Sequence, residues 1–246
     1  MTIYALSLSH FCASIRRNIY EYIRRNATHH LCRFHSIHRF HRTDMSHITI
    51  YRSIPEQIAA RLQQDILLGI LQPGQPLREQ DLSSEFGVSR GPIREAFRQL
   101  TEQGLLTLEP NKGVRVAQLP SPKVRPLIAE LRRKIELFVL ENIFERITEA
   151  DLAAWEEILE EMRRACERND LRSLVEQDLR FHRAIIQSHD DEGLLILWQP
   201  IALRMLMQYN RFTDLMDSYH EHRRILDAIR AHDKAAALQA LQENIQ

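Results

Sequence analysis

The chain lacks the features that mark membrane-spanning, disulfide-bonded or globally basic proteins. No apolar run approaches the ~20 residues that span a bilayer, so no membrane partner is expected. Basic and acidic residues balance at 33 each, so any affinity for nucleic acid must come from a local patch. Cysteine is scarce, and its spacing fits neither a metal site nor a redox motif. We therefore expect the protein in a reducing compartment, the cytoplasm. The three cysteines are Cys12, Cys32 and Cys166.

Acidic residues are nearly absent from residues 1–46, where only Glu21 and Asp44 stand among many arginines and histidines. The apolar start of this segment precedes its charges, the reverse of a secretory signal. A histidine-rich metal tract is an alternative, although no helical or finger spacing supports it. We interpret the segment as a disordered extension, or as sequence upstream of a true start at Met45.

A helix with two unlike faces is predicted between Ser89 and Gly104. Ser89 is a good N-cap, because its hydroxyl can accept a hydrogen bond from an amide of the first turn. Pro92 is tolerated in that turn, where the N–H it lacks would have no helical partner, and Gly104 should end the helix as a left-handed cap. The buried stripe has the spacing of an amphipathic helix and consists of Ile93, Ala96, Phe97 and Leu100.

The opposite face of this helix carries Gly91, Arg94 and Arg98, with Arg90 on its flank. Arginine at the exposed start of a short helix can pair with guanine or hold phosphate in the major groove. Gly91 would let the backbone approach the duplex closely. An ordinary solvent-exposed face would explain the same arginines. The neighbouring elements must therefore distinguish a DNA-binding face from a merely exposed one.

Those neighbouring elements predict a winged helix-turn-helix. They are an amphipathic helix at 55–68, a short helix at 79–86, and two β-like runs at 105–109 and 114–117. The turn that joins the two runs holds Lys112 and Gly113, and we expect this wing to contact the DNA backbone or minor groove. Arg78, before the short helix, is a further candidate phosphate contact.

The residue order of this region closely resembles the DNA-binding domain of GntR-family bacterial transcription regulators. The resemblance covers roughly residues 54–117 without a gap, through the segments 69–79, 87–96 and 104–106. It implies a double-stranded DNA operator as partner. The predicted DNA-binding residues are Arg78, Ser89, Arg90, Gly91, Pro92, Arg94, Arg98, Lys112 and Gly113.

Glycine nearly disappears after the proline-containing hinge at 119–122, and helical periodicity takes over. We predict a mainly α protein: a winged helix-turn-helix domain at 47–119 and an all-helical bundle of about six helices at 120–246. Pro200 should kink or restart the fourth helix of the bundle. Thr148 and Asp151 form a predicted capping box at the start of the second helix. The apolar stripe of the first helix is Leu127, Leu131, Ile135 and Phe138.

Two predicted bundle helices carry ionisable residues inside their apolar stripes. Asp178 and His182 are four residues apart in the third helix, and His222 lies in the stripe of the fifth. A buried carboxylate is costly unless it is paired or binds a metal. One Asp and two His that converge would suit Zn²⁺ or a similar ion with one position left open. The alternative is a buried Asp–His hydrogen bond with His222 packed separately.

The bundle sequence also looks like a known domain, in the segments 131–136, 176–183 and 221–229. Together they resemble the FCD effector domain of the FadR subfamily of GntR regulators, over about residues 124–245. Its metal-dependent members hold a divalent cation with one Asp and three His, and the metal receives a small carboxylate effector. Asp178, His182 and His222 match three of these ligands. The fourth position falls on Asn244, a poor ligand for zinc or nickel, so the set is incomplete.

Three further residues are candidates for effector binding. Arg132 matches an arginine that lies near the effector carboxylate in this domain, and a fork-shaped guanidinium suits that task. A surface salt bridge to Glu136, four residues on, is the alternative. Arg204 and Tyr209 are expected to line the cavity, although amphipathic packing explains them equally well.

These patterns predict a cytoplasmic, homodimeric transcription regulator, a metabolite-responsive repressor rather than an enzyme. Two recognition helices would read the half-sites of a pseudo-palindromic operator, and a small organic acid would modulate binding, through a divalent metal if one is bound. The rival interpretation is a metal-dependent enzyme that uses the same Asp-His-His set, but no further acid or base stands beside those residues. The third interpretation is a helical bundle that serves only in protein–protein interaction.

Overall fold

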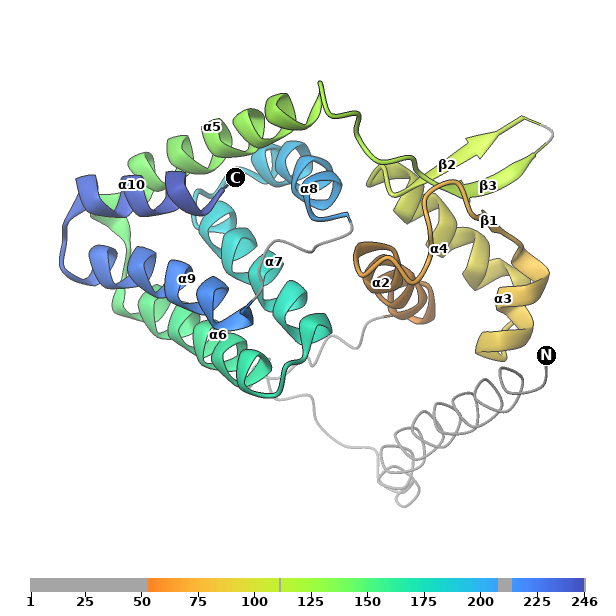
Figure 1. Ribbon diagram of the computed structural model, residues 1–246, viewed down its shortest axis with the longest axis horizontal. Helices are drawn as coiled ribbons and strands as arrows, with labels where there is room; N and C mark the ends of the chain where they lie inside the picture. Colours follow the sequence, from red (N-terminus) through yellow and green to blue (C-terminus); the bar gives the residue numbers. More distant parts are fainter. Residues whose placement is uncertain (1–52, 111, 208–213, 246) are drawn as a thin grey trace, which may run out of the picture. The chain divides into compact units, whose positions relative to one another are not determined.

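The computed structural model describes residues 53–110, 112–207 and 214–245 (Figure 1). The predictions for residues 1–46, and the one for Tyr209, fall outside these described residues. In the described part, no helix has the length and apolar character needed to cross a membrane.

The first part of the described chain confirms the predicted winged helix-turn-helix. Its elements are α2 (Ile54–Leu67), α3 (Glu79–Phe86), α4 (Arg90–Glu102), β2 (Leu106–Glu109) and β3 (Gly113–Val116). A strand that was not predicted, β1 (Pro76–Leu77), pairs with β3 and gives the sheet the order β1-β3-β2. Two residues are too short to show a strand period, which is why the sequence does not reveal β1.

Helix α4 ends as predicted and begins with one difference. Gly104 adopts φ 74°, and the N–H of Leu105 reaches back to the carbonyl of Leu100 at 2.9 Å, so a left-handed glycine closes the helix. Ser89 occupies the N-cap, but its hydroxyl makes no capping hydrogen bond. The predicted role of the Ser89 side chain as a cap is therefore wrong, although the start of the helix is right.

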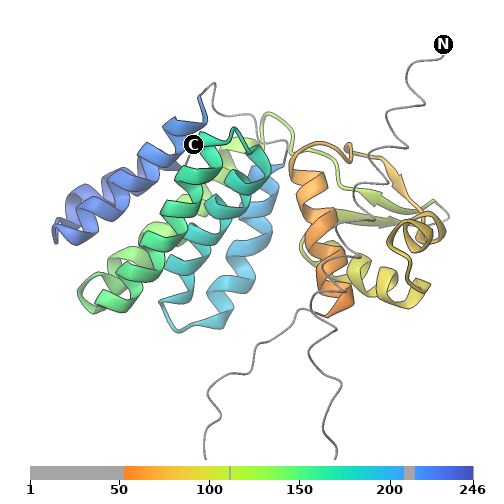
Figure 2. The ribbon, with the colours of Figure 1, turned by 90° about the horizontal axis from the view of Figure 1, so that it is seen from below.

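The second part is the predicted bundle of six α-helices, with a short 3₁₀ turn at Phe144–Arg146. The helices are α5 (Arg125–Ile143), α6 (Glu149–Glu167), α7 (Leu171–Gln187), α8 (Glu192–Leu206), α9 (Leu215–Arg230) and α10 (Lys234–Asn244). Helix α7 packs against α5, α6 and α8, while α9 packs against α6 and α10 (Figures 1 and 2). This arrangement puts α7 in the middle of the bundle.

Helix α8 continues without interruption through Pro200, so the predicted restart of the helix there is wrong. The missing N–H of Pro200 would have bonded to the carbonyl of Ile196, four residues earlier. Ile196 is 72 % exposed, at the surface, where water can replace a lost helical donor.

The stripe predicted for α5 faces the wrong way. Leu127, Leu131 and Phe138 are 56 %, 42 % and 51 % exposed, whereas Arg132 and Glu136 are buried. The two buried side chains form an ion pair, so a polar pair occupies the inner face and leaves apolar side chains outside. Hydrophobic periodicity alone cannot recognise such a face.

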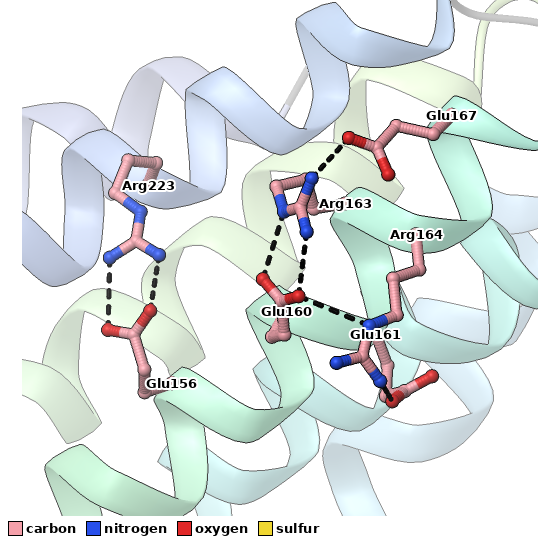
Figure 3. Close-up of polar contacts among 7 residues, drawn as sticks. All are labelled: Glu156, Glu160, Glu161, Arg163, Arg164, Glu167 and Arg223. Carbon is pink, nitrogen blue, oxygen red and sulfur yellow. Dashed lines mark hydrogen bonds and ion pairs between the residues drawn. The ribbon is translucent and has the colours of Figure 1, made fainter.

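Charged side chains hold α6 against α9 (Figure 3). Arg223 of α9 forks onto the carboxylate of Glu156 in α6, and its Nη1 lies 3.0 Å from Glu156 Oε2. The hydrogen bond from Arg223 lowers the pKa of Glu156. At the start of α6, Thr148 and Asp151 form the predicted capping box. The ion pair fixes the position of α6 beside α9, the helix that carries His222.

Candidate functional site

Asp178, His182 and His222 converge inside the bundle. One turn of α7 carries Asp178 and His182, α9 carries His222, and the three residues are between 0 % and 5 % exposed. One candidate ligand atom from each lies within 4.8 Å of the others. His182 Nε2 is 3.2 Å from His222 Nε2, and His222 Nε2 is 3.4 Å from Asp178 Oδ1. His222 is therefore not packed separately from the other two.

The outer nitrogens of the two rings fix where their protons lie. His222 Nδ1 is 2.7 Å from the carbonyl oxygen of Ser218, which can only accept, so Nδ1 carries the hydrogen. His182 Nδ1 is 2.6 Å from the Glu136 carboxylate, and the same reasoning applies. Burial lowers the pKa of His222 to about 4, against the opposing effect of the Asp178 carboxylate, so this ring is neutral near pH 7. Both rings then present a lone pair at Nε2.

When both rings carry their single hydrogen on Nδ1, the centre of the cluster collects acceptors with no proton to share. The two Nε2 lone pairs face each other beside Asp178 Oδ1, and Asp178 Oδ2 is buried without a hydrogen-bond partner in the described part of the chain. Such an arrangement repels itself unless a cation lies among the acceptors. Two imidazole nitrogens and one carboxylate oxygen form a donor set that zinc or nickel accepts with one position open. The residues fit a divalent metal.

Asn244, at the fourth ligand position of the resemblance, is buried in the last turn of α10. Its Nδ2 donates to Glu221 Oε2 at 3.0 Å. The amide is thus engaged with a carboxylate of α9. This contact is consistent with the predicted incomplete set of three ligands.

Arg132 and Glu136 form the salt bridge that the sequence suggested, but in the interior rather than at the surface. Arg132 Nε donates to Glu136 Oε1 at 2.6 Å, and the two side chains are 3 % and 0 % exposed. Trp198 Nε1 donates to the same oxygen at 2.6 Å. Burial would raise the pKa of Glu136, but Arg132, His182 and Trp198 together lower it to about 2.

Sequence reasoning missed Glu136 and Trp198 as parts of this site. The available signal was the i, i+4 spacing of Glu136 from Arg132, which is also the spacing of an ordinary surface pair. Only the packing of α5 against α7 and α8 shows that the pair is buried.

Arg204, at the end of α8, lies in a different place from the histidines. Its Nη1 donates to the carbonyl of Gly104, just past the recognition helix, at 3.3 Å. It lines a cavity of about 530 Å³ together with the linker residues Gln118 and Leu119. Burial lowers the pKa of Arg204. None of the hydrogen bonds or ion pairs among the described residues joins it to the Asp-His-His cluster, so its predicted effector role stays a prediction.

The predicted DNA-binding arginines stand at the surface in contact with α3 or with their own helix. Arg94 Nε lies 2.8 Å from Glu79 Oε2, and its side chain is 65 % exposed. Arg90 Nη2 lies 3.3 Å from Gln80 Oε1. Arg98, 58 % exposed, is paired with Glu95 and Glu102, which raise its pKa. Ion pairs this exposed contribute little stability, so phosphate can replace the acidic partners.

The other predicted DNA-binding positions are also accessible. Gly91 is exposed, and a β-carbon there would meet only Ser89 Oγ, at 3.9 Å, so no neighbouring side chain covers the backbone. On the wing, Gly113 adopts φ 78°, which favours glycine, and Lys112 Nζ lies 3.2 Å from Glu109 Oε2. Arg78 is exposed at the start of α3, and Pro92 is half-buried in the first turn of α4.

Comparisons with known proteins agree with this two-part architecture. The profile of the family described as "Bacterial regulatory proteins, gntR family" matches residues 54–116, and the profile "FCD domain" matches residues 127–246. The HTH-type transcriptional repressor RspR of Escherichia coli is 30% identical over 200 residues, which cover 78% of this chain and 86% of that protein.

Two other relatives are named for the operons that they repress. The gluconate operon transcriptional repressor of Bacillus subtilis is 28% identical and covers 76% of this chain and 80% of its own. The galactonate operon transcriptional repressor of Escherichia coli is 29% identical and covers 75% and 90%. Among solved structures, E. coli McbR/YncC shares the fold, with a TM-score of 0.68 at 24% identity over 80% of this chain and 95% of that one.

Proposed function

This chain belongs to the GntR family of bacterial transcription regulators and carries an FCD domain. We propose that it is a repressor whose affinity for an operator changes when a small carboxylate binds. Regulators of this family bind DNA, and FCD domains bind small-molecule effectors. The family makes the protein a transcription regulator rather than a metal-dependent enzyme. A cytoplasmic location stays a prediction.

At the DNA, helix α4 would enter the major groove. Arg94 and Arg90 stand at its exposed start, where they would meet base edges, while Arg98 and Lys112 would hold phosphates. In the free protein Arg94 is paired with Glu79, and this contact must open when the duplex binds. Losing it costs little, because the pair is exposed.

An exposed apolar face supports binding as a homodimer. Leu127, Leu131 and Phe138 lie along one side of α5, and Ile196 and Leu197 of α8, which packs beside α5, are 72 % and 63 % exposed. Apolar side chains gathered on neighbouring helices are typical of a protein interface. A two-fold copy packed on this face would provide the second recognition helix for a pseudo-palindromic operator.

The observation that supports a metal-dependent effector site is the meeting of acceptor atoms from Asp178, His182 and His222 in a buried space. A divalent ion bound there would supply positive charge and an open coordination position for a carboxylate. The chain itself supplies the orientation: the Ser218 carbonyl holds the ring of His222, and the Glu136 carboxylate holds that of His182.

The charges around the site favour a ligand with one negative charge. The charges of Arg132 and Glu136 cancel, and the carboxylate of Asp178 adds one negative charge beside the two imidazoles. A divalent ion would turn this into one positive charge, which a monocarboxylate would neutralise. Two relatives are repressors named for gluconate and galactonate operons, and both compounds are hydroxylated monocarboxylates. Sugar acids are therefore the first effectors to test.

Helix α7 offers a direct route from this site to the DNA-binding part. Six residues before Asp178, Arg172 Nη2 lies 2.7 Å from Asp65 Oδ1 of α2, and Arg172 Nη1 donates to Gln64 Oε1 at 2.9 Å. A ligand that shifts α7 would therefore change the position of α2. This contact supports a coupling between effector binding and operator binding. The effector would shift the equilibrium between two arrangements of the dimer that differ in operator affinity.

The deciding experiment measures DNA binding with the metal and the acid varied separately. Genomic DNA fragments selected by the protein would be titrated against metal-free protein, protein with Zn²⁺ or Ni²⁺, and metal-loaded protein with gluconate or galactonate. We expect sequence-specific binding that a sugar acid weakens only when the metal is present. Sequence-specific binding that ignores both additions would remove the effector proposal. No preference among duplexes would remove the regulator proposal itself.

A further inference from the structure

The Glu136 carboxylate lies in the second layer of the Asp-His-His cluster, with a hydrogen-bond donor on each oxygen. Oε1 accepts from Arg132 Nε and Trp198 Nε1, and Oε2 faces His182 Nδ1, each at 2.6 Å. The side chain is fully buried. A carboxylate held by this many donors cannot turn away from His182, because any rotation would leave buried donors unpaired.

The contact to His182 decides which ring nitrogen has the free lone pair. A neutral imidazole has one N–H and one lone pair, and either nitrogen can carry the hydrogen. An ionised carboxylate accepts only, so the hydrogen of His182 lies on Nδ1. The lone pair then lies on Nε2, the nitrogen that faces His222 Nε2 at 3.2 Å.

We propose that Glu136 is the positioning residue of this centre, which sets the tautomer and the ring orientation of His182 so that its Nε2 is ready to bind a divalent metal. This inference rests on the proposed metal-dependent function, but its central statement concerns the protein without metal. Glu136 is outside the group of candidate ligands and would act through His182. Ser218 has the equivalent task for His222 through its carbonyl, which no side-chain substitution can remove.

The Glu136 carboxylate forms hydrogen bonds with residues of three helices. Glu136 and Arg132 lie on α5, His182 on α7 and Trp198 on α8. Arg132, the candidate effector residue, is therefore tied through Glu136 to a candidate metal ligand. A hydrogen-bonded carboxylate behind a ligand histidine typically improves metal affinity by roughly 10- to 100-fold.

The first test needs only the wild-type protein without metal. Nitrogen-15 chemical shifts and two-bond couplings distinguish the two tautomers of a histidine, and the His182 signals are assigned by their loss in His182→Asn. We expect the hydrogen of His182 on Nδ1, the nitrogen that faces the Glu136 carboxylate. A hydrogen on Nε2 alone, or on both nitrogens, would overturn the proposal whether or not the protein binds metal.

The second test compares Glu136→Gln with Trp198→Phe by calorimetric titration with Zn²⁺ alone. Glu136→Gln should populate the Nε2–H tautomer and weaken Zn²⁺ binding by roughly 10- to 100-fold. Trp198→Phe removes a donor to Oε1 and some packing but keeps the Glu136–His182 contact, so it should keep the tautomer and bind Zn²⁺ within about threefold of wild type.

The two variants also separate this proposal from the proposed function. Equal Zn²⁺ affinity in folded Glu136→Gln and wild type would refute the positioning role. A wild type that binds no Zn²⁺ or Ni²⁺ yet shows the Nδ1–H tautomer would refute the metal proposal and keep the assignment of the tautomer. If Glu136→Gln does not fold, as judged by circular dichroism, the wild-type tautomer decides alone.

Discussion

The Nε2 atoms of His182 and His222 face each other at 3.2 Å, and the Nδ1 atom of each ring faces a buried oxygen. Two lone pairs at this separation have no direct attraction for each other. A cation bound between them, as proposed above, would relieve this unfavourable contact.

Acid should destabilise the metal-free protein through His222. The pKa of this ring falls from 6.5 to about 4 on folding, chiefly because it is buried, so between these values the unfolded chain binds the proton more tightly. Stability should therefore fall as pH drops from about 6.5 to 4, by up to about 3 kcal/mol from this residue. Urea unfolding at several pH values measures it. The loss should be smaller in His222→Asn, and an equal loss would exclude His222 as its source.

Replacing Asn244 by histidine should strengthen metal binding. Asn244 occupies the position where the resemblance places a fourth ligand, and imidazole is a much better ligand than an amide for zinc or nickel. We expect Asn244→His to tighten Zn²⁺ binding by at least tenfold, measured by competition with a coloured chelator. His220→Asn, two residues before His222 but at the surface, should leave the affinity unchanged. No gain in Asn244→His would mean that α10 does not reach the metal.

Removing Arg94 and removing Lys112 should weaken DNA binding in different ways. Arg94 stands on the exposed face of the recognition helix, whereas Lys112 lies on the wing. We expect Arg94→Ala to abolish the preference for the operator, and Lys112→Ala to weaken specific and random DNA alike and lower the salt dependence. Fluorescence anisotropy with both duplexes checks this. Equal losses on the two duplexes for Arg94→Ala would contradict its role in base reading.

Charges on the exposed face of α5 should separate the proposed dimer. Leu127 and Leu131 are 56 % and 42 % exposed, and burying carboxylates against a second copy would be unfavourable. The double variant Leu127→Glu/Leu131→Glu should sediment as a monomer at micromolar concentration and keep its helical content. Leu108→Glu, a control at a 70 % exposed residue of β2, should sediment like the wild type. A dimer that survives the double substitution would place the interface elsewhere.

Arg172→Ala should uncouple effector from operator. The substitution removes the contacts of Arg172 itself to Asp65 and Gln64, keeps the one from Glu176 to Gln64, and leaves the Asp-His-His cluster intact. We expect normal metal binding and normal operator affinity without effector, but a reduced change in that affinity when a sugar acid binds. Arg168→Ala, at the end of α6, removes a similar charge and should change none of these values. A full effector response in Arg172→Ala would show that the signal does not pass through this contact.

The sequence predicted local features well because they have local causes. The winged helix-turn-helix, the glycine that closes α4 and the capping box of α6 all depend on neighbouring residues. The prediction of the inner face of α5 is wrong because other helices bury the ion pair of Arg132 and Glu136. The place of Arg204 beside Gly104 depends on a contact between residues 100 positions apart, which no periodicity encodes.

Trp198 gives the protein a built-in optical probe. It is one of only two tryptophans, with Trp155, and its indole N–H is bonded to the carboxylate that also holds His182. Indole emission responds to the charge and hydrogen bonding around it, and Trp155 can be replaced by phenylalanine to isolate the signal. Occupation of the centre by ions or acids should thus be readable from unlabelled protein, in solution and in real time.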